Sequence, residues 1–530
     1  MTDLPPHHPL SSHPLSRRPL DRRSLLRAGA IGTGLIAATA FAGGRASGLV
    51  RSDRPVLTHG VQSGDVDRHS AMVWTRADRP SRMRVEVSTD PSFARSRVVP
   101  GPLLTPETGG TGKVRVRGLP TGADVHYRVV AEDLDGRATS EPVVGRLRTA
   151  PSGRADVRLV WSGDVAGQGW GINPDIGGMP AFSAMAARRP DLFLHSGDTV
   201  YADNPIEETV TLPDGRVYHN LVTEAKSKVA ETLEDYRGQF AYNLMADSVR
   251  EFNALVPSYV QWDDHEVVNN WYPGEILDLP EYTEKRVDVL TARALRAFHE
   301  WHPIDPKRAE DGRVYRSFTY GDHVEVFVLD MRSYKDRNDG DPRRQDGRIL
   351  GERQADWLVR GLEKSTATWK FVQADLPIGL VVPDGEDSPD QEAVSNGLPG
   401  APGGRETELA GVLSRIARSD VRNVVWLTAD VHYTAAHHYS PDRAAFGDFA
   451  PFWEFVSGPL HAGAFGPNDL DPTFGPKAVF THCPPAADTS PMEGFQHFGE
   501  INVDGESGAL TVDLRDGTGA SLWSKTLQPE

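Results

Sequence analysis

Residues 191–203 read DLFLHSGDTVYAD. The stretch starts as an apolar strand, Leu192–His195, and Gly197 then lets the backbone turn sharply. Asp198, Tyr201 and Asp203 follow on the loop. A strand that ends in a glycine turn and polar side chains is typical of an open α/β sheet, which binds ligands beyond the carboxyl ends of its strands.

Acidic residues follow the neighbouring predicted strands in the same way. Strands expected at 157–161, 258–262, 324–329, 371–374 and 424–427 lead into Asp164, Asp263 with Asp264, Asp330, Asp375 and Asp430. Helices are predicted at 181–188, within 222–254, at 286–301, and near 352–363 and 405–418. This alternation predicts an α/β domain over residues 155–520. A single aspartate at a strand end is usually a turn former, but six in succession predict one acidic crevice whose repulsion bound cations would offset.

Two further stretches add donors of other kinds. Residues 262–270 read WDDHEVVNN, and residues 429–432 read ADVH. Carboxylate, phenolate, imidazole and amide groups together suit Fe(III), Mn(II), Ca(II) or Zn(II). Structural roles stay open for some of them: Tyr201 could be a core residue, His265 could bond a loop carbonyl, and Arg332 could pair with carboxylates instead of holding a phosphate.

Other chemistries lack their residues. The sequence around His265 has no second histidine at the spacing of a HExxH zinc site, and no GxSxG serine motif occurs. The one cysteine, Cys483, excludes a disulfide framework and a multi-cysteine zinc site. The formal net charge of −17 argues against a nucleic-acid partner.

The first 52 residues differ from the rest in charge and hydropathy. They carry seven arginines and two aspartates, including the pair Arg22 and Arg23. An apolar run follows at 28–42, and small residues follow that run. This order predicts a twin-arginine signal peptide over residues 1–48, with the twin-arginine translocase as an export partner and a secreted, periplasmic or cell-wall location. No other stretch is long and apolar enough to span a membrane.

Residues 55–149 have the pattern of a small all-β domain. Short strands with period-2 character are expected at 71–74, 83–87, 113–117 and 126–130. Leu119, Pro120 and Tyr127 suggest the corner of a fibronectin-III-like sandwich, in which the tyrosine bonds back to the preceding loop. Residues 109–113 are not a phosphate-binding loop, because a strand follows them where a helix is required, and a hairpin turn is expected instead.

Four motifs in order carry a family resemblance: GDxxYxD at 197–203, WDDHE with NN at 262–270, LDxRxY at 329–334 and the late ADVH. They resemble the PhoD-type alkaline phosphatase/phosphodiesterase family, a branch of the calcineurin-like metallophosphoesterases. The resemblance covers essentially the whole chain beyond residue 20. It implies an αββα sandwich around Fe(III) and Ca(II), and hydrolysis of phosphoesters by a metal-bound hydroxide that attacks the phosphorus in line.

The resemblance also implies roles for single residues. Asp198 would bridge the metal ions and His265 would lie beside the phosphoryl group or the leaving oxygen, which makes these two the expected catalytic residues. The remaining expected ligands are Asp164, Tyr201 and His432 for one ion, and Asp264 and Asp430 for another, with Asn269, Asn270 and Arg332 as further metal or substrate contacts. Gly163 stands where family members often have a cysteine ligand of iron, so Mn(II) or Zn(II) stays open.

The expected substrate is a small phosphoester or phosphodiester, and a monomer is expected. Alkaline phosphatase, teichoic-acid-type phosphodiesterase and phospholipase D-like activities are not separated by these motifs. An alternative of a different class is a secreted surface-binding protein with a degenerate metal site. Only the position of Gly163 departs from the family pattern, which favours the enzyme.

Overall fold

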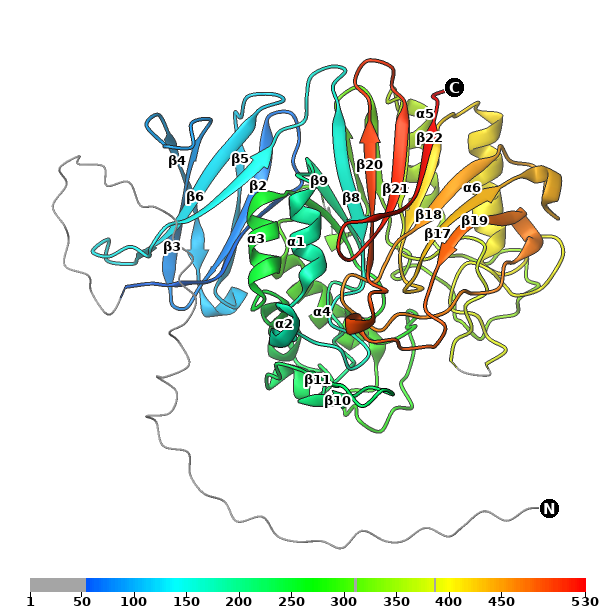
Figure 1. Ribbon diagram of the computed structural model, residues 1–530, viewed down its shortest axis with the longest axis horizontal. Helices are drawn as coiled ribbons and strands as arrows, with labels where there is room; N and C mark the ends of the chain where they lie inside the picture. The colour runs from blue at the N-terminus through cyan, green and yellow to red at the C-terminus, as the bar shows by residue number, and fades with distance from the viewer. Residues whose placement is uncertain (1–53, 309–311, 386–387) are drawn as a thin grey trace, which may run out of the picture. The chain divides into compact units, whose positions relative to one another are not determined.

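Two large β-sheets form the centre of the computed structural model, which describes residues 54–308, 312–385 and 388–530. The first sheet has nine strands in the order β22 (Ser521–Leu527), β21 (Leu510–Asp516), β20 (His497–Val503), β8 (Val157–Ser162), β9 (Leu192–Ser196), β12 (Ser258–Gln261), β1 (Leu57–Gly64), β2 (Ser70–Ala77) and β5 (Thr111–Arg117). The second has seven, in the order β13 (Arg316–Tyr320), β14 (Val324–Val328), β15 (Trp369–Gln373), β16 (Val424–Thr428), β18 (Phe452–Val456), β17 (Thr434–Tyr439) and β19 (Pro476–His482). Their strands are labelled in Figure 1.

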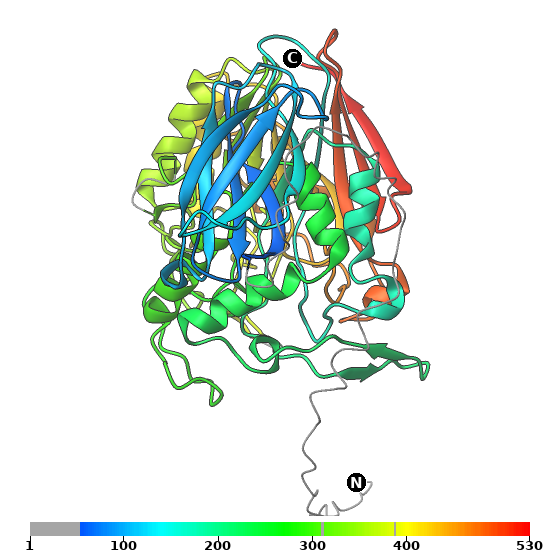
Figure 2. The same ribbon diagram turned by 90° about the vertical axis from the view of Figure 1, so that its left-hand side faces the viewer.

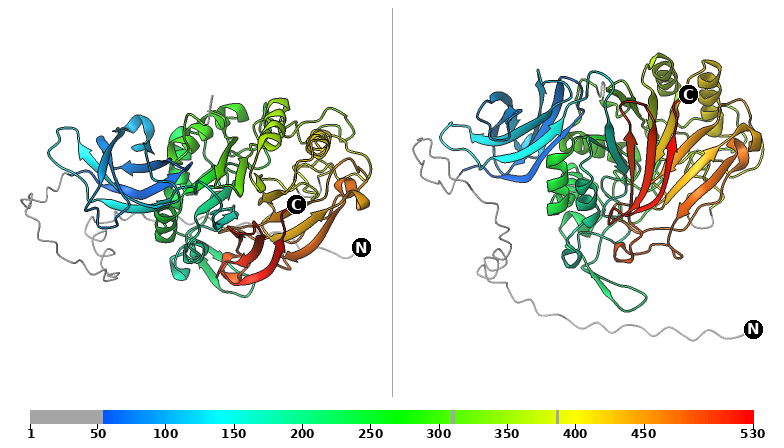
Figure 3. Two further views of the ribbon diagram at one scale, coloured as in Figure 1. Left: turned by 90° about the horizontal axis from the view of Figure 1, so that it is seen from above. Right: turned by 45° about the horizontal axis from the view of Figure 1, so that its top comes forward.

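The sheets pack face to face, and helices cover their outer faces. Leu159 and Leu194 of the first sheet share a buried cluster with Val326 and Phe371 of the second. The helices are α1 (Pro180–Ala187), α2 (Leu233–Asn243), α3 (Asp247–Leu255) and α4 (Val287–Trp301) beside the first sheet, and α5 (Glu352–Lys364) and α6 (Glu406–Arg418) on the second. The layers can be followed in Figure 3. The predicted αββα sandwich is confirmed.

The N-terminal strands form a sandwich that shares a sheet with the catalytic part (Figure 2). One of its sheets contains β4 (Arg97–Leu104), β3 (Ser81–Ser88), β6 (Asp124–Asp133) and β7 (Val143–Arg148). Its other strands, β1, β2 and β5, belong to the nine-stranded sheet, because β1 pairs in parallel with β12 at Gly64 and Ser258. The predicted all-β region is confirmed, and its sheet is continuous with the catalytic sheet.

Two details of this region differ from expectation. The Tyr127 hydroxyl does not bond to the preceding loop; it donates to the Ala254 carbonyl at the end of α3, 3.2 Å away. Gly145 makes this contact possible, since a Cβ there would lie 2.2 Å from the Tyr127 ring. Residues 109–113 are not a hairpin turn, because β4 and β5 lie in different sheets and the chain crosses between them through a 3-10 turn at Pro106–Thr108.

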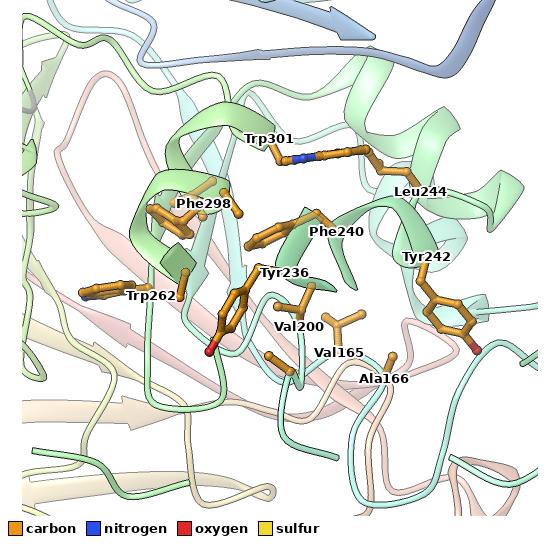
Figure 4. Packing of buried hydrophobic residues seen from close by; sticks show 14 of the residues in the cluster. Val165, Ala166, Val200, Tyr236, Phe240, Tyr242, Leu244, Trp262, Phe298 and Trp301 are labelled. Carbon is orange, nitrogen blue, oxygen red and sulfur yellow. The ribbon is translucent and has the colours of Figure 1, made fainter. Parts of the chain in front are cut away.

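Aromatic packing fixes the loop that follows β12. Trp262 is fully buried, and its ring centroid lies 5.9 Å from that of Phe298 on α4 and 5.8 Å from that of Trp271. Figure 4 shows Trp262 and Phe298 beside Tyr236 and Phe240 in this core. Two buried tryptophans therefore anchor both ends of the acidic segment between residues 262 and 271.

The twin-arginine segment, residues 1–48, lies outside the described residues. Among the residues that the structure describes, no helix is long and apolar enough to cross a membrane.

Candidate metal centre

The centre forms where strands of both sheets end. Asp164 follows β8, Asp198 follows β9, Asp264 follows β12 and Asp430 follows β16. Three of these aspartates have left-handed backbone, with φ of 66° at Asp164, 47° at Asp198 and 65° at Asp430, and φ is 59° at His432. Side chains other than glycine rarely adopt this conformation, and such strain concentrates at functional sites. The sharp turns aim the side chains into one region.

Asp164 is a fully buried carboxylate whose oxygens have no hydrogen-bond partner among the described residues. Asp164, Asp198 and His432 bring one donor atom each within 4.8 Å of one another. Burial, and next the charge of Asp430, raise the pKa of Asp164 well above its usual range. An unpaired buried carboxylate is costly, so these donors fit a bound metal ion.

Tyr201 completes this donor group. Its hydroxyl lies 2.7 Å from His432 Nε2, and its ring is fully buried. Gly167 makes room for the ring, since a Cβ there would lie 2.5 Å from it. His432 Nδ1 donates to the Gly463 carbonyl at 2.5 Å, which turns Nε2 toward the site. Burial lowers the pKa of His432 to about 4, so the imidazole is neutral, as a metal ligand must be.

A second donor group shares Asp198 with the first. It consists of Asp198, Asp264 and His265. The backbone N–H of His265 donates to Asp198 Oδ1 at 3.2 Å, and His265 Nδ1 lies 2.8 Å from Asp203 Oδ1. Burial alone would lower the pKa of His265, but the carboxylates of Asp203 and Asp264 outweigh it and raise the value to about 9. Because Nδ1 contacts Asp203, Nε2 is the ring nitrogen that remains available for proton transfer.

The third acidic group is already paired with an arginine. Asp263, Asp264 and Asp430 also lie within reach of one metal position, yet Arg332 Nη2 lies 3.2 Å from Asp430 Oδ1 and contacts Asp263. Arg332 is fully buried. Arg332 is thus paired with carboxylates, and its contact with a substrate phosphate stays a prediction.

Not all six strand-end acids converge as expected. Asp330 accepts hydrogen bonds from the Trp262 indole at 3.0 Å and from the Ser333 backbone at 3.0 Å, so it closes a turn behind the site. Asp375 pairs with Arg332, 3.2 Å from its Nε. Local turn hydrogen bonds and a buried arginine therefore hold the aspartates at two of the six strand ends.

The two asparagines lie at the edge of the site. Asn270 donates through its backbone to Asp264 Oδ2 at 2.6 Å and through Nδ2 to Asp384 Oδ1 at 2.8 Å. Asn269 is exposed, and its backbone N–H donates to Asp203 at 2.8 Å. Their backbone contacts hold the carboxylates of Asp264 and Asp203 in place.

Gly163 is packed closely against the neighbouring strands. A Cβ at this position would lie 3.0 Å from the Ala429 side chain and 3.0 Å from the Gly197 carbonyl. A larger residue would therefore have to displace its neighbours by a few tenths of an ångström.

Sequence reasoning did not assign roles to Asp203 and Glu266, although both lie inside the quoted motifs. Glu266 is buried and accepts hydrogen bonds from the Thr199 backbone and hydroxyl, each at 2.6 Å, and from the Asp263 backbone at 2.8 Å. It thereby ties the loop of Asp198 to the loop of Asp264. The five-residue spacing from Asp198 to Asp203 was visible, but only the fold places Asp203 against His265.

Comparison with known proteins agrees with this geometry. The model of the PhoD-like phosphatase family matches residues 159–514, and the model of the PhoD-like phosphatase N-terminal domain matches residues 44–151. Alkaline phosphatase D of Bacillus subtilis (strain 168) is 28% identical over 433 residues, which are 77% of this chain and 70% of the relative.

Two solved structures share the fold. A structure of PhoD matches with a TM-score of 0.70 at 22% identity, over 91% of this chain and 92% of the other. A purple acid phosphatase, PPD1 from yellow lupin (Lupinus luteus) seeds, matches with a TM-score of 0.57 at 12% identity, over 90% of this chain and 74% of the other. With both family models matched across the two parts of the fold, the chain belongs to the PhoD-like phosphatase family and is a phosphoric ester hydrolase.

Proposed function

We propose that the protein hydrolyses small phosphomonoesters or phosphodiesters with at least two metal ions that share Asp198. One observation carries the proposal: the donor group Asp164–Asp198–His432 and the carboxylate pair Asp198–Asp264, which lies beside His265, adjoin at a single carboxylate. A shared carboxylate places two cations close together, as an in-line displacement at phosphorus requires.

Asp164, Asp198, Tyr201 and His432 would hold one ion, and Asp198 and Asp264, with Asp430 nearby, would hold the other. Phenolate favours Fe(III), and an all-oxygen set favours Ca(II), so Fe(III) with Ca(II) is the proposed pair, and Mn(II) or Zn(II) is the alternative. When bound, the ions would supply positive charge for the phosphoryl oxygens and lower the pKa of water.

His265 is the proposed proton donor. Asp203 holds its Nδ1 at 2.8 Å, so the ring is fixed in orientation and Nε2 can deliver a proton to the leaving oxygen. The backbone N–H of the same residue donates to Asp198, which links the proton donor to the shared ligand.

We also propose that residues 1–48 direct export, and that residues 55–149 and 155–520 are the two domains of the mature chain.

The test is an assay of the purified protein on one phosphomonoester and one phosphodiester, with elemental analysis of the same sample. We expect turnover of at least one substrate and at least two metal ions per chain. Asp198→Asn should lose both metal and turnover, whereas Asp330→Asn, a matched change of a buried strand-end aspartate outside the site, should keep the metal. Full metal content and full turnover in Asp198→Asn would refute the proposal.

A further inference from the structure

The Asp263–Asp264–Asp430 group contains a cation that the chain itself supplies. Arg332 Nη2 lies 3.2 Å from Asp430 Oδ1 and 3.9 Å from Asp264 Oδ1, and it also contacts Asp263. The Arg332 side chain is 0% exposed. A guanidinium nitrogen therefore lies among the three carboxylates that would otherwise bind a metal ion.

Two further buried carboxylates, outside the Asp263–Asp264–Asp430 group, contact the guanidinium. Arg332 Nη1 donates to Glu392, and Arg332 Nε lies 3.2 Å from Asp375 Oδ2. Lys335 Nζ lies 3.4 Å from Glu392 Oε1. All four side chains are buried. If Arg332 moved away from this position, several buried carboxylates would lose their counter-ion, which would strongly destabilise the fold.

Asp164 and Asp198, at the opposite end of the site, pair with no arginine or lysine among the described residues: none lies within 4.0 Å of a carboxylate oxygen of either. The imidazole of His432 lies 3.8 Å from Asp164 Oδ1, and it is the neutral ring described above. Compensation of the buried carboxylates is thus uneven: Arg332 provides it near Asp430, the imidazole of His265, with its raised pKa, provides it beside Asp198 and Asp264, and near Asp164 it is left to a bound ion.

We propose that Arg332 is a positioning residue that acts as the permanent cation of the Asp263–Asp264–Asp430 group and weakens the binding of the adjacent metal ion. Its charge repels a cation at Asp264, while its hydrogen bonds hold Asp263 and Asp430 in place. The ion shared by Asp198 and Asp264 is then the exchangeable one, and the ion at Asp164, Asp198, Tyr201 and His432 is the tightly held one. This inference rests on the proposed function for the existence of the two ions, but its readout is metal affinity.

The test uses purified holoenzyme equilibrated with graded chelator and then titrated with Ca²⁺ or Mn²⁺, with bound metal measured by elemental analysis. The wild type should show one retained and one exchangeable ion. Arg332→Met removes the charge but keeps an apolar stem. It should tighten the exchangeable ion about tenfold or more, since the Coulomb repulsion between a unit charge and a divalent ion a few ångströms apart exceeds, even in water, the free energy of a tenfold change in affinity. It should also lower the melting temperature of the metal-free protein and enlarge the rise on adding Ca²⁺.

A matched control separates this effect from loss of a buried ion pair in general. Arg316 is 2% exposed and pairs with Asp65 at 3.0 Å, outside the site. Arg316→Met should destabilise the fold and leave both metal affinities unchanged.

A second variant moves the affinity in the opposite direction and keeps the test decisive if Arg332→Met does not fold. Glu392→Gln removes a negative charge that contacts Arg332 and Lys335 but belongs to neither of the two proposed metal-binding groups. The exchangeable ion should then bind several-fold more weakly.

Unchanged metal affinity in both Arg332→Met and Glu392→Gln, with only the KM of the first raised, would make Arg332 a substrate clamp and overturn the inference. Tighter binding in Glu392→Gln would also overturn it. A wild type that binds no metal and hydrolyses no phosphoester would instead reject the proposed function itself.

Discussion

The surroundings of Tyr201 fit a metal ligand better than an ordinary core tyrosine. Its ring is packed and fully buried, as a core tyrosine would be, but its hydroxyl faces His432 Nε2 at 2.7 Å beside the unpaired carboxylate of Asp164. Burial, and next the charges of Asp198 and Asp164, raise the pKa of Tyr201 well above its usual range in the absence of a cation. A metal ion at this position would reverse that effect.

Tyr201→Phe should therefore reduce turnover far more than stability. Loss of one buried hydroxyl usually costs about 1 kcal/mol in unfolding free energy, whereas loss of a ligand weakens the ion that activates the nucleophile. If iron(III) is bound, the phenolate-to-iron absorption band should also disappear. The measurements are turnover, metal content, visible absorption and denaturant unfolding. A destabilised variant with its metal and turnover intact would assign Tyr201 to the core.

Asp203→Asn should impair catalysis without removing metal. The amide keeps the shape of the side chain but removes the negative charge that raises the pKa of His265. Proton donation contributes about 10²–10⁴-fold to such reactions, and it matters most when the leaving oxygen is basic. Turnover of an alkyl phosphoester should fall far more than turnover of a nitrophenyl phosphoester. Equal losses on both substrates would show that Asp203 does not act through proton transfer.

At the scale of elements, the loops after β9 and β12 act as one unit because Glu266 joins them. Both of its oxygens accept hydrogen bonds, Oε1 from Thr199 and Oε2 from the Asp263 backbone. The separation of Asp198 from Asp264 therefore depends on a residue that binds neither ion. Groups that orient metal ligands typically affect metal affinity about 10–100-fold.

Glu266→Gln should weaken metal binding by about tenfold. The new amide presents an N–H donor where the carboxylate had accepted hydrogen bonds from N–H or O–H groups. Glu454→Gln is the matched control: Glu454 is also buried and accepts hydrogen bonds from the Ile378 backbone and the Tyr439 hydroxyl, each at 2.7 Å, but it lies among other strands. Metal titration of both variants checks the prediction. Equal metal affinity in the two would mean that Glu266 only supports the fold.

At the scale of the whole molecule, buried neutral histidines make stability depend on pH. Burial lowers the pKa of His497 to about 3. Its Nδ1 donates to the Gly458 carbonyl at 3.0 Å, and its Nε2 lies 2.8 Å from His482 Nδ1. Between pH 6.5 and about 3, His497 binds a proton in the unfolded chain and not in the folded one, so stability rises with pH across this window and falls on acidification.

His497→Asn should remove this contribution, because asparagine can keep the donor to Gly458 without titrating. Between pH 7 and pH 5 the wild type should lose about 2 kcal/mol more unfolding free energy than the variant, since one pH unit corresponds to about 1.4 kcal/mol per group. Denaturant unfolding at both pH values, with metal content held constant, measures the difference. Parallel pH profiles would show that His497 does not titrate differently on folding.

Export is the second property of the whole chain that can be tested. Arg22→Lys with Arg23→Lys keeps the charge and hydropathy of the segment but changes the pair that the translocase receptor reads. The precursor should accumulate in the cytoplasm, as fractionation and immunoblotting would show. Unchanged secretion would mean that the general pathway carries the protein.

Local patterns in the amino-acid sequence are enough to predict the strands, the helices and the fold class. Alternating apolar strands and amphipathic helices predicted the α/β sandwich, and the period-2 strands before residue 150 predicted the all-β region. The residues at six strand ends were predicted to meet, because parallel strands end at the same edge of a sheet, and Asp164, Asp198, Asp264 and Asp430 are among those that do. These features follow from side chains that are neighbours in the chain or repeat with a fixed period.

Contacts between residues far apart in the chain become visible only in the folded protein. Tyr201 and His432 are 231 residues apart, and Arg332 and Asp430 are 98 residues apart. Tyr127 donates to Ala254 and not to its own loop, and β1 joins the catalytic sheet at β12. Arg332 could have faced a phosphate or a carboxylate; the packing of two sheets placed it among Asp263, Asp264 and Asp430. Long-range contacts depend on how whole elements pack, and local periodicity carries no information about that.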